Sequence, residues 1–384
     1  MILYLAWFFL SIIICYSTLK SSKKTQNQWV TFFLLALGIF VGLSDMFGGY
    51  DRYIYGELYD SMADVTHAGG NPWTSYSFAF YGGEFGYGTF CALLTYLTGN
   101  RYIFIFITTM IIYILLIKSL KQYVDNAPFA VVMFMGLWFF FTFTYLRQVI
   151  GCTIVWLSIK YIIERDWKRF LLVWFIAFSF HNSAIIFLPV YFLPIRKFTR
   201  QQVLIVMAAA LLLGLSQLPQ AMFAAYGEVD EGRVNAAGYA TDAGFRWAYL
   251  IEAGFFLYVI LSNYKNISNK AKDVMMLNIA LIFCAILLVF VRSENGGRLG
   301  WMFMIGVMCT LSNICISKKR LLAHGILLMV VCLALYVRVY NAWQLYMNLY
   351  PYKTFLTNGH REGDPVYEMY EYDTNYDIDK FYRK

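Results

Sequence analysis

The sequence predicts an all-α, polytopic integral membrane protein of about twelve transmembrane helices, because three observations agree. First, the chain of 384 residues is 60% hydrophobic and only 14% charged, whereas soluble proteins carry about 25% charged residues. Second, apolar runs of roughly 17–20 residues recur, each long enough to cross a bilayer core of about 30 Å. Third, Lys and Arg gather in short clusters between these runs. Residues 1–340 are therefore expected to form a single transmembrane helical domain.

The expected spans follow the apolar runs in chain order. They are 1–19, 29–47, 101–118, 127–143, 149–163, 170–181, 183–195, 203–219, 246–264, 274–291, 299–316 and 321–340. A further run, 84–99, is short and polar at its edges, so we expect a surface helix within the long outer loop 48–100. The second long outer loop is 220–245. The polar tail 341–384, rich in Tyr and acids, is also expected outside the cytoplasm.

The positions of the basic residues predict which ends of the helices face the cytoplasm. Six Lys-containing clusters lie at 20–24, 118–121, 165–169, 196–200, 265–272 and 318–320. Such connectors are retained on the cytoplasmic side. An even number of spans must separate neighbouring clusters, so residues 170–195 are expected to reverse near His181 as two short helices. The connectors that carry Arg but no Lys then lie on the outer face.

Two outer carboxylates and one histidine are candidate catalytic residues. Asp51 lies in the first outer loop and Glu84 begins the short run, and a carboxylate at such a place can act as a general base or hold a substrate hydroxyl. His181 interrupts an apolar segment, where an imidazole can donate or accept a proton. The competing interpretations are a solvated or helix-capping carboxylate and a hydrogen-bonded packing histidine.

Arginine without lysine on the outer face points to an anionic ligand, because the planar guanidinium binds phosphate or carboxylate in a bidentate manner. The competing interpretation is that these side chains anchor the helices at the membrane edge. The motif that begins at Asp51 also contains two tyrosines, Tyr53 and Tyr55. The candidate binding residues are Arg52, Arg147, Gln148, Arg246, Arg292, Arg298, Tyr53 and Tyr55.

Several other classes of protein are disfavoured. The seven cysteines form no CxxC or Cys/His cluster, so no metal site is expected. No nucleotide-binding motif is present, and no cofactor is expected. The net charge of +8 lies mostly in the cytoplasmic connectors, which argues against a nucleic-acid partner. Only Glu252 falls well inside an apolar run, which disfavours an ion-coupled transporter.

The order of the outer motifs resembles the EpsG family of Wzy-like exopolysaccharide polymerases, over most of residues 40–300. The motifs are Asp51-x-Tyr53-x-Tyr55, Glu84-Phe85-Gly86-Tyr87, Asn100 before a span, Arg147-Gln148 opening a span, Phe180-His181-Asn182-Ser183-Ala184, and the pair Arg292 and Arg298. Family members usually carry an Arg before the Asp loop. Here Leu43-Ser44-Asp45 stands in that place, so Arg52 is expected to supply that part of the phosphate clamp.

The resemblance implies a GT-C-like membrane glycosyltransferase that needs no cofactor. Its substrate would be a polyprenyl-diphosphate-linked oligosaccharide, whose repeat units it joins at the extracytoplasmic face of the bacterial cytoplasmic (inner) membrane. The product would be an exopolysaccharide, capsule or O-antigen. The arginines would hold the diphosphate, and Asp51, Glu84 or His181 would act on the acceptor hydroxyl. Membrane lipid, a chain-length regulator and a flippase are the expected partners.

Two alternatives stay open from the sequence. An O-antigen-type ligase or a single-sugar lipid-linked glycosyltransferase would use the same lipid carrier but would add only once. A flippase or exporter of lipid-linked sugars would need access from the inner face, where few candidate site residues are found.

Overall fold

The computed structural model describes residues 1–44, 50–227, 242–317, 319–344, 349–350 and 352–356. Helices make up most of this part of the chain. The α-helices are α1 (Ile2–Thr18), α2 (Lys23–Leu43), α3 (Tyr50–His67), α4 (Tyr76–Tyr81), α5 (Phe85–Thr95), α6 (Arg101–Tyr123), α7 (Ala127–Leu137), α8 (Phe141–Thr144), α9 (Leu146–Trp156), α10 (Ile159–Ile163), α11 (Trp167–Phe180), α12 (Arg200–Leu215), α13 (Leu218–Gly227), α15 (Trp247–Ser262), α16 (Ala271–Val289), α17 (Met304–Cys315) and α18 (Ala323–Gln344).

Short 3-10 segments and one small hairpin complete the described fold. The 3-10 segments are η1 (Pro72–Thr74), η2 (Gly82–Glu84), η3 (Asn182–Phe192), η4 (Tyr264–Asn266) and η5 (Gly296–Phe303). The hairpin pairs β1 (Ile316–Ser317) with β2 (Arg320–Leu321) in antiparallel register. It lies between α17 and α18, at one of the basic clusters.

Every expected span contains a helical segment, but the expected count of about twelve is not confirmed. Among the described residues, six helical stretches are long and apolar enough to cross a membrane. They are Lys23–Leu43, Arg101–Tyr123, Leu146–Ile163, Ala271–Val289, Gly296–Cys315 and Ala323–Trp343. Shorter apolar helices occupy Ile2–Thr18, Ala127–Leu137, Asn182–Phe192, Arg200–Leu215 and Trp247–Ser262. The apolar runs were read correctly as helices, and their ends differ from the expected bounds by several residues.

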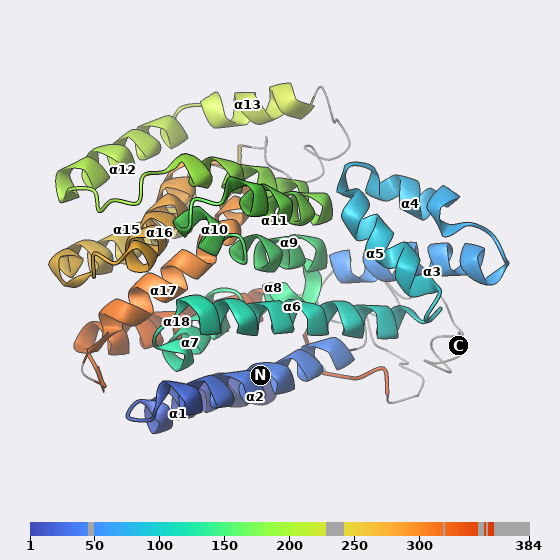
Figure 1. Cartoon of the computed structure of the whole chain (residues 1–384), viewed down its shortest axis with the longest axis horizontal. Helices are drawn as coiled ribbons and strands as arrows, with labels where there is room; N and C mark the ends of the chain where they lie inside the picture. Colours follow the sequence, from blue (N-terminus) through green and yellow to red (C-terminus); the bar gives the residue numbers. More distant parts are fainter. Residues whose placement is uncertain (45–49, 228–241, 318, 345–348, 351, 357–384) are drawn as a thin grey trace.

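Polar contacts join several of the basic connectors at one end of the helices. Asp125, between α6 and α7, accepts hydrogen bonds from Lys23 at 3.1 Å and from Lys272 at 2.9 Å. Burial alone would raise the pKa of Asp125, but the two lysines outweigh it and lower that pKa. Lys319 donates to the main-chain oxygen of Lys20 at 3.0 Å. In Figure 1 these connectors lie on the left, whereas α3, α4 and α5 lie on the right.

The chain reverses at His181, as the charge pattern predicts. Trp174 of α11 donates from Nε1 to the carbonyl of Ala184 in η3 at 2.8 Å. Further along, the rings of Phe170 and Tyr191 stack with their centroids 5.0 Å apart. The returning segment is a 3-10 helix and not the expected α-helix, and Pro189 within it cannot donate an α-helical hydrogen bond. His181 therefore lies at the turn, at the same end as α3–α5.

The expected first outer loop, 48–100, is more helical than the sequence analysis predicts, because α3 fills its first third. Arg52 in the first turn of α3 is fully buried. Its guanidinium donates to the carbonyls of Val41 at 3.0 Å, Ser44 at 2.9 Å and Phe143 at 3.2 Å. A cation at the end of α2 stabilises carbonyls that have no partner within the helix. Arg52 thus holds the start of α3 against α2 and α8.

A second buried arginine holds the middle of α3. Arg101 at the start of α6 donates from Nε to Oδ2 of Asp60 at 2.5 Å, and both side chains are nearly inaccessible. Asn100, one of the motif residues, caps α6 by accepting from the backbone N–H groups of Tyr102 and Ile103. The expected surface helix 84–99 corresponds to α5, which begins at Phe85.

The first described part of the tail packs against the ends of α2 and α6. Tyr352 stacks on Phe40 with ring centroids 4.3 Å apart, and Phe355 stacks on Tyr102 at 5.4 Å. Residues 357–384 of the tail, residues 228–241 of the expected loop 220–245, and Asp45 lie outside the described residues.

Candidate functional site

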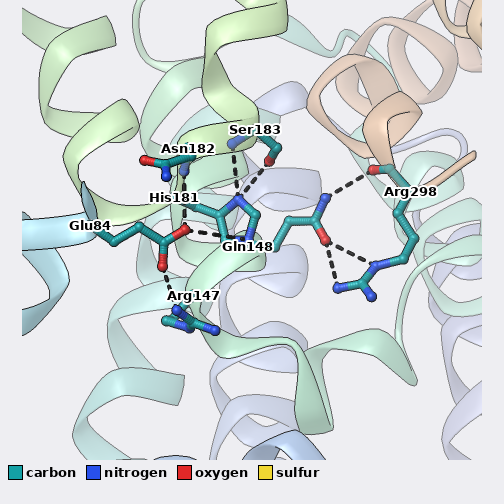
Figure 2. A network of polar contacts seen from close by, with 7 residues as sticks. All are labelled: Glu84, Arg147, Gln148, His181, Asn182, Ser183 and Arg298. Carbon is teal, nitrogen blue, oxygen red and sulfur yellow. Dashed lines mark hydrogen bonds and ion pairs between the residues drawn. The ribbon is translucent and has the colours of Figure 1, made fainter. Parts of the chain in front are cut away.

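Glu84 connects three segments that are far apart in the sequence (Figure 2). Its Oε2 accepts a hydrogen bond from Nη1 of Arg147 at 2.5 Å. Its Oε1 accepts from the main-chain N–H of Asn182 at 3.2 Å and lies 3.9 Å from Nε2 of His181. The Glu84 side chain is only 5% exposed. The structure therefore brings two other candidate residues, Arg147 and His181, to the buried carboxylate of Glu84.

Two glycines allow these segments to approach so closely. A Cβ on Gly86 would lie 2.1 Å from Oγ of Ser179, so a side chain there would push α5 away from α11. A Cβ on Gly151 of α9 would lie 3.1 Å from Cβ of His181. Glycine is the residue that permits such backbone approach. Gly86 belongs to the Glu-Phe-Gly-Tyr motif. This motif therefore contains both Glu84 and the glycine that lets Glu84 approach α11.

The hydrogen bonds of His181 assign its proton. Nδ1 accepts the main-chain N–H of Ser183 at 3.2 Å and lies 2.7 Å from Oγ of the same residue. A ring nitrogen that accepts an N–H bond carries no proton. The neutral ring therefore holds its proton on Nε2, which is the nitrogen that faces Glu84.

Arg298 reaches the site from η5 and is held by Gln148. Its Nε and Nη2 donate to Oε1 of Gln148 at 3.2 and 3.0 Å. In return, Nε2 of Gln148 donates to the carbonyl of Arg298 at 3.1 Å. Figure 2 shows Arg147 and Gln148, neighbours on α9, pointing to two sides: one toward Glu84, the other toward Arg298.

Aromatic rings flank both arginines. The guanidinium carbon of Arg147 lies 5.1 Å from the ring centre of Tyr55 and 5.8 Å from that of Tyr81. That of Arg298 lies 4.0 Å from the ring of Tyr145 and 5.4 Å from that of Trp301. The sequence analysis did not single out Tyr81, Tyr145 or Trp301. For the last two a signal existed, since each lies within three positions of a candidate arginine.

Asp51 lies beside this network without being bonded into it. Among the described residues, no hydrogen bond or ion pair reaches its half-buried carboxylate. Burial raises the pKa of Asp51, and the charges of Arg298 and then Arg147 oppose that rise. Asp51 also precedes Tyr55 by one helical turn, and Tyr55 packs on Arg147. The carboxylate of Asp51 is thus influenced by the charges of two arginines and forms no ion pair with either.

Two candidate residues of α3 have other neighbours. Arg52 faces the carbonyls at the end of α2, as described above, and is not part of the Glu84 network. Tyr53 donates to Oε1 of Glu57 at 2.7 Å, and its ring lies 6.0 Å from the guanidinium carbon of the buried Arg101. These contacts hold α3 in place, and we carry neither side chain into the proposed site.

Arg246 and Arg292 form a neighbouring group with a residue that the sequence analysis did not name. Nη2 of Arg292 pairs with Oδ2 of Asp242 at 2.5 Å, and this hydrogen bond lowers the pKa of Asp242 and raises that of Arg292. Arg246 donates to the carbonyl of Glu294 at 2.8 Å. These bonds tie the start of α15 to the segment that leads into Arg298.

The arrangement can bind an anion and move a proton. Arginines stabilise negative charge that develops on a phosphate or an alkoxide, and a carboxylate beside them can accept a proton from a hydroxyl. In the part of the chain that the structure describes, no three His, Cys, Asp or Glu side chains lie close enough to hold a metal ion.

Comparisons with known proteins give one match. The sequence profile of the EpsG family matches residues 27–354, which is most of the chain and extends beyond the motifs that suggested the resemblance. Neither a curated protein sequence nor a solved structure matches it. The long apolar helices agree with a multi-pass membrane protein. From the profile match, together with the motif residues gathered around Glu84, we conclude that the chain belongs to the EpsG family.

Proposed function

We propose that this protein is a polysaccharide polymerase of the membrane glycosyltransferase kind. It joins polyprenyl-diphosphate-linked oligosaccharide repeat units by glycosyl transfer at the extracytoplasmic face of the bacterial cytoplasmic membrane. The product is an exopolysaccharide, a capsule or an O-antigen. Family membership supports this proposal, because the EpsG family implies a Wzy-like polymerase of polysaccharide biosynthesis.

The observation that carries the proposal is the meeting of Glu84, Arg147, His181 and Arg298 at one end of the helices (Figure 2). These residues come from four separate segments, and none of those segments belongs to the basic connectors. The Lys-containing connectors lie at the opposite end, held together through Asp125. A site at the end opposite the Lys-containing connectors agrees with chemistry on the outer face.

The side chains suit transfer from a lipid diphosphate. The leaving diphosphate gains negative charge as the glycosidic bond breaks, and preorganised guanidinium groups stabilise that charge without a metal. A carboxylate accepts the proton of the attacking hydroxyl. The tyrosines and tryptophan around the arginines offer flat faces to sugars and to the membrane interface.

The proposed partners follow from this chemistry. The substrate is a polyprenyl-diphosphate-linked oligosaccharide, which reaches the site from the surrounding membrane lipid. A flippase must deliver it to the outer face, and a chain-length regulator is a further partner.

A deletion strain tests the proposal. Complementation with the wild-type gene is expected to restore a ladder of polymer lengths. Complementation with Arg147→Ala or His181→Ala is expected to leave single lipid-linked repeat units on the outer face. A product extended by one unit only points to a ligase or single-sugar transferase. Repeat units trapped on the inner face of the deletion strain point to a flippase, and either result contradicts the proposal.

A further inference from the structure

The two arginines of the site differ in their partners. Arg147 pairs with the carboxylate of Glu84 at 2.5 Å, so much of its charge is compensated. Arg298 is held through the neutral amide of Gln148. Among the described residues, no carboxylate lies within ion-pair distance of Arg298. Arg298 therefore keeps a positive charge available for a ligand.

The amide of Gln148 fixes Arg298 without neutralising it. Gln148 is 1% exposed, and its oxygen and nitrogen are both engaged with the same arginine. The rings of Tyr145 and Trp301 flank the guanidinium and add attraction without adding a formal charge. A cation that is rigidly held, partly exposed and not paired with a carboxylate is suited to bind an anionic group.

Glu84 is already occupied by protein donors. One oxygen accepts from Arg147, and the other accepts from the main chain of Asn182 and faces the protonated nitrogen of His181. Its side chain is 5% exposed, so a substrate hydroxyl has little access to it. Each of these contacts fixes the geometry of another site residue.

Asp51 has the opposite properties. It is partly exposed, and no hydrogen bond or ion pair engages it in the described part of the chain. It precedes Tyr55 by one turn of α3, and the ring centre of Tyr55 lies 5.1 Å from the guanidinium carbon of Arg147, so Asp51 is on the face of α3 that meets this arginine. A group with this access and this freedom can approach a substrate hydroxyl, whereas Glu84 cannot do so without losing its partners.

We infer that the site divides its tasks: Arg298 binds the diphosphate, Asp51 accepts the proton of the acceptor hydroxyl, and Glu84 is a positioning residue for Arg147 and His181. This inference rests on the proposed function. In the transfer step the hydroxyl oxygen bonds to the anomeric carbon. The bond from that carbon to the diphosphate oxygen breaks, and its electron pair leaves with the polyprenyl diphosphate. The hydroxyl proton passes to Asp51.

The first test measures binding of farnesyl diphosphate, a short polyprenyl diphosphate, to the purified full-length protein in detergent. Arg298→Ala is expected to weaken binding by about 10- to 100-fold, as for loss of a charged hydrogen bond. Glu84→Gln is expected to tighten binding, because it leaves Arg147 uncompensated. Lys270→Ala, which removes an exposed cation at the opposite end, is the matched control and should bind as wild type does. Unchanged affinity of Arg298→Ala overturns its role.

The second test measures turnover of a lipid-diphosphate repeat unit by the same proteins. Asp51→Asn is expected to lower kcat by about 10²- to 10⁴-fold while farnesyl diphosphate still binds. Glu84→Gln keeps an acceptor oxygen and should retain much more activity than Glu84→Ala. If Glu84→Gln is as inactive as Asp51→Asn, or if Asp51→Asn turns over normally, the division of tasks is wrong. If wild type itself gives no turnover, the proposed function fails and the role of Asp51 fails with it.

Discussion

Gln148 and Arg298, 150 positions apart in the chain, hold each other through three hydrogen bonds of 3.0 to 3.2 Å. Two run from the guanidinium to the amide oxygen, and one runs from the amide nitrogen back to the arginine carbonyl. Because the amide is neutral, this contact orients the guanidinium and leaves its charge intact. Arg147, which precedes Gln148 on α9, is instead paired with the carboxylate of Glu84, and this ion pair compensates its charge.

The neutrality of Gln148 leads to a prediction about Gln148→Glu. The new carboxylate would lie against Arg298, so we expect the affinity for farnesyl diphosphate to fall by about tenfold or more. Gln148→Ala removes the orientation but adds no negative charge, and should bind more tightly than Gln148→Glu. Isothermal titration of both variants measures the difference. Equal affinity of the two would show that the charge of Arg298 is not used.

The pH dependence of turnover should depend on Arg298. In the proposed mechanism Asp51 acts as the anion, so activity is expected to be lost as the pH falls through its pKa. Burial raises this pKa, and the charges of Arg298 and Arg147 oppose that rise. Arg298→Gln removes one opposing charge, so the pKa rises further and the acid limb of kcat moves to higher pH. A kcat–pH profile at saturating substrate measures this; a limb that stays in place or moves to lower pH contradicts the assignment of Asp51.

The approach of α5 to α11 depends on Gly86. In Gly86→Ala the new Cβ would lie 2.1 Å from Oγ of Ser179, so we expect stability to fall by about 1–3 kcal/mol and polymer yield to fall with it. Gly254→Ala is the matched control, because no atom lies within 4 Å of its new Cβ. Adding Ser179→Gly to Gly86→Ala should restore part of the yield. Thermal melting in detergent and polymer yield in cells measure both effects. Equal melting temperatures and polymer yields for Gly86→Ala and Gly254→Ala would show that α5 and α11 can accommodate a side chain at position 86.

Arg52 provides a test between structural and ligand-binding roles. Its guanidinium donates to the buried carbonyls of Val41, Ser44 and Phe143, so Arg52→Ala should lower the free energy of unfolding by about 2–4 kcal/mol. Arg52→Lys should recover only part, since an ammonium group cannot reach all three. Thermal melting of the detergent-solubilised variants measures this. If Arg52→Ala instead melts as wild type does but no longer binds farnesyl diphosphate, Arg52 binds the phosphate, as the sequence analysis expected.

The helical segments and the reversal at His181 could be predicted from the sequence because both depend on local patterns, whereas the exact helix ends could not. Apolar runs gave the helical segments, and the alternation of basic clusters gave the reversal at His181. Helix α3 was missed because its sequence, YDRYIYGELYDSMADVTH, is rich in charged and polar residues. Two buried arginines, Arg52 and Arg101, hold it in place, and a chain read residue by residue gives no sign that an arginine will be buried.

The members of the site were also predictable, but their relationships were not. Motif order named Asp51, Glu84, Arg147, His181 and Arg298 as candidates. That Glu84 is bonded to Arg147, and that Gln148 is bonded to Arg298, depends on contacts between residues 63 and 150 positions apart. Such contacts follow from helix packing and not from any local pattern. Tyr55 was named, whereas Tyr81 and Tyr145 were missed because each contacts an arginine that is distant in the sequence.

The most direct test of the account is turnover of a purified lipid-diphosphate repeat unit by the full-length protein in detergent or in vesicles, with and without a chelator. The account predicts a ladder of products that the chelator leaves unchanged, because arginines and not a metal stabilise the leaving diphosphate. A product extended by a single unit, or a ladder that vanishes with chelator and returns with Mg²⁺, would contradict it.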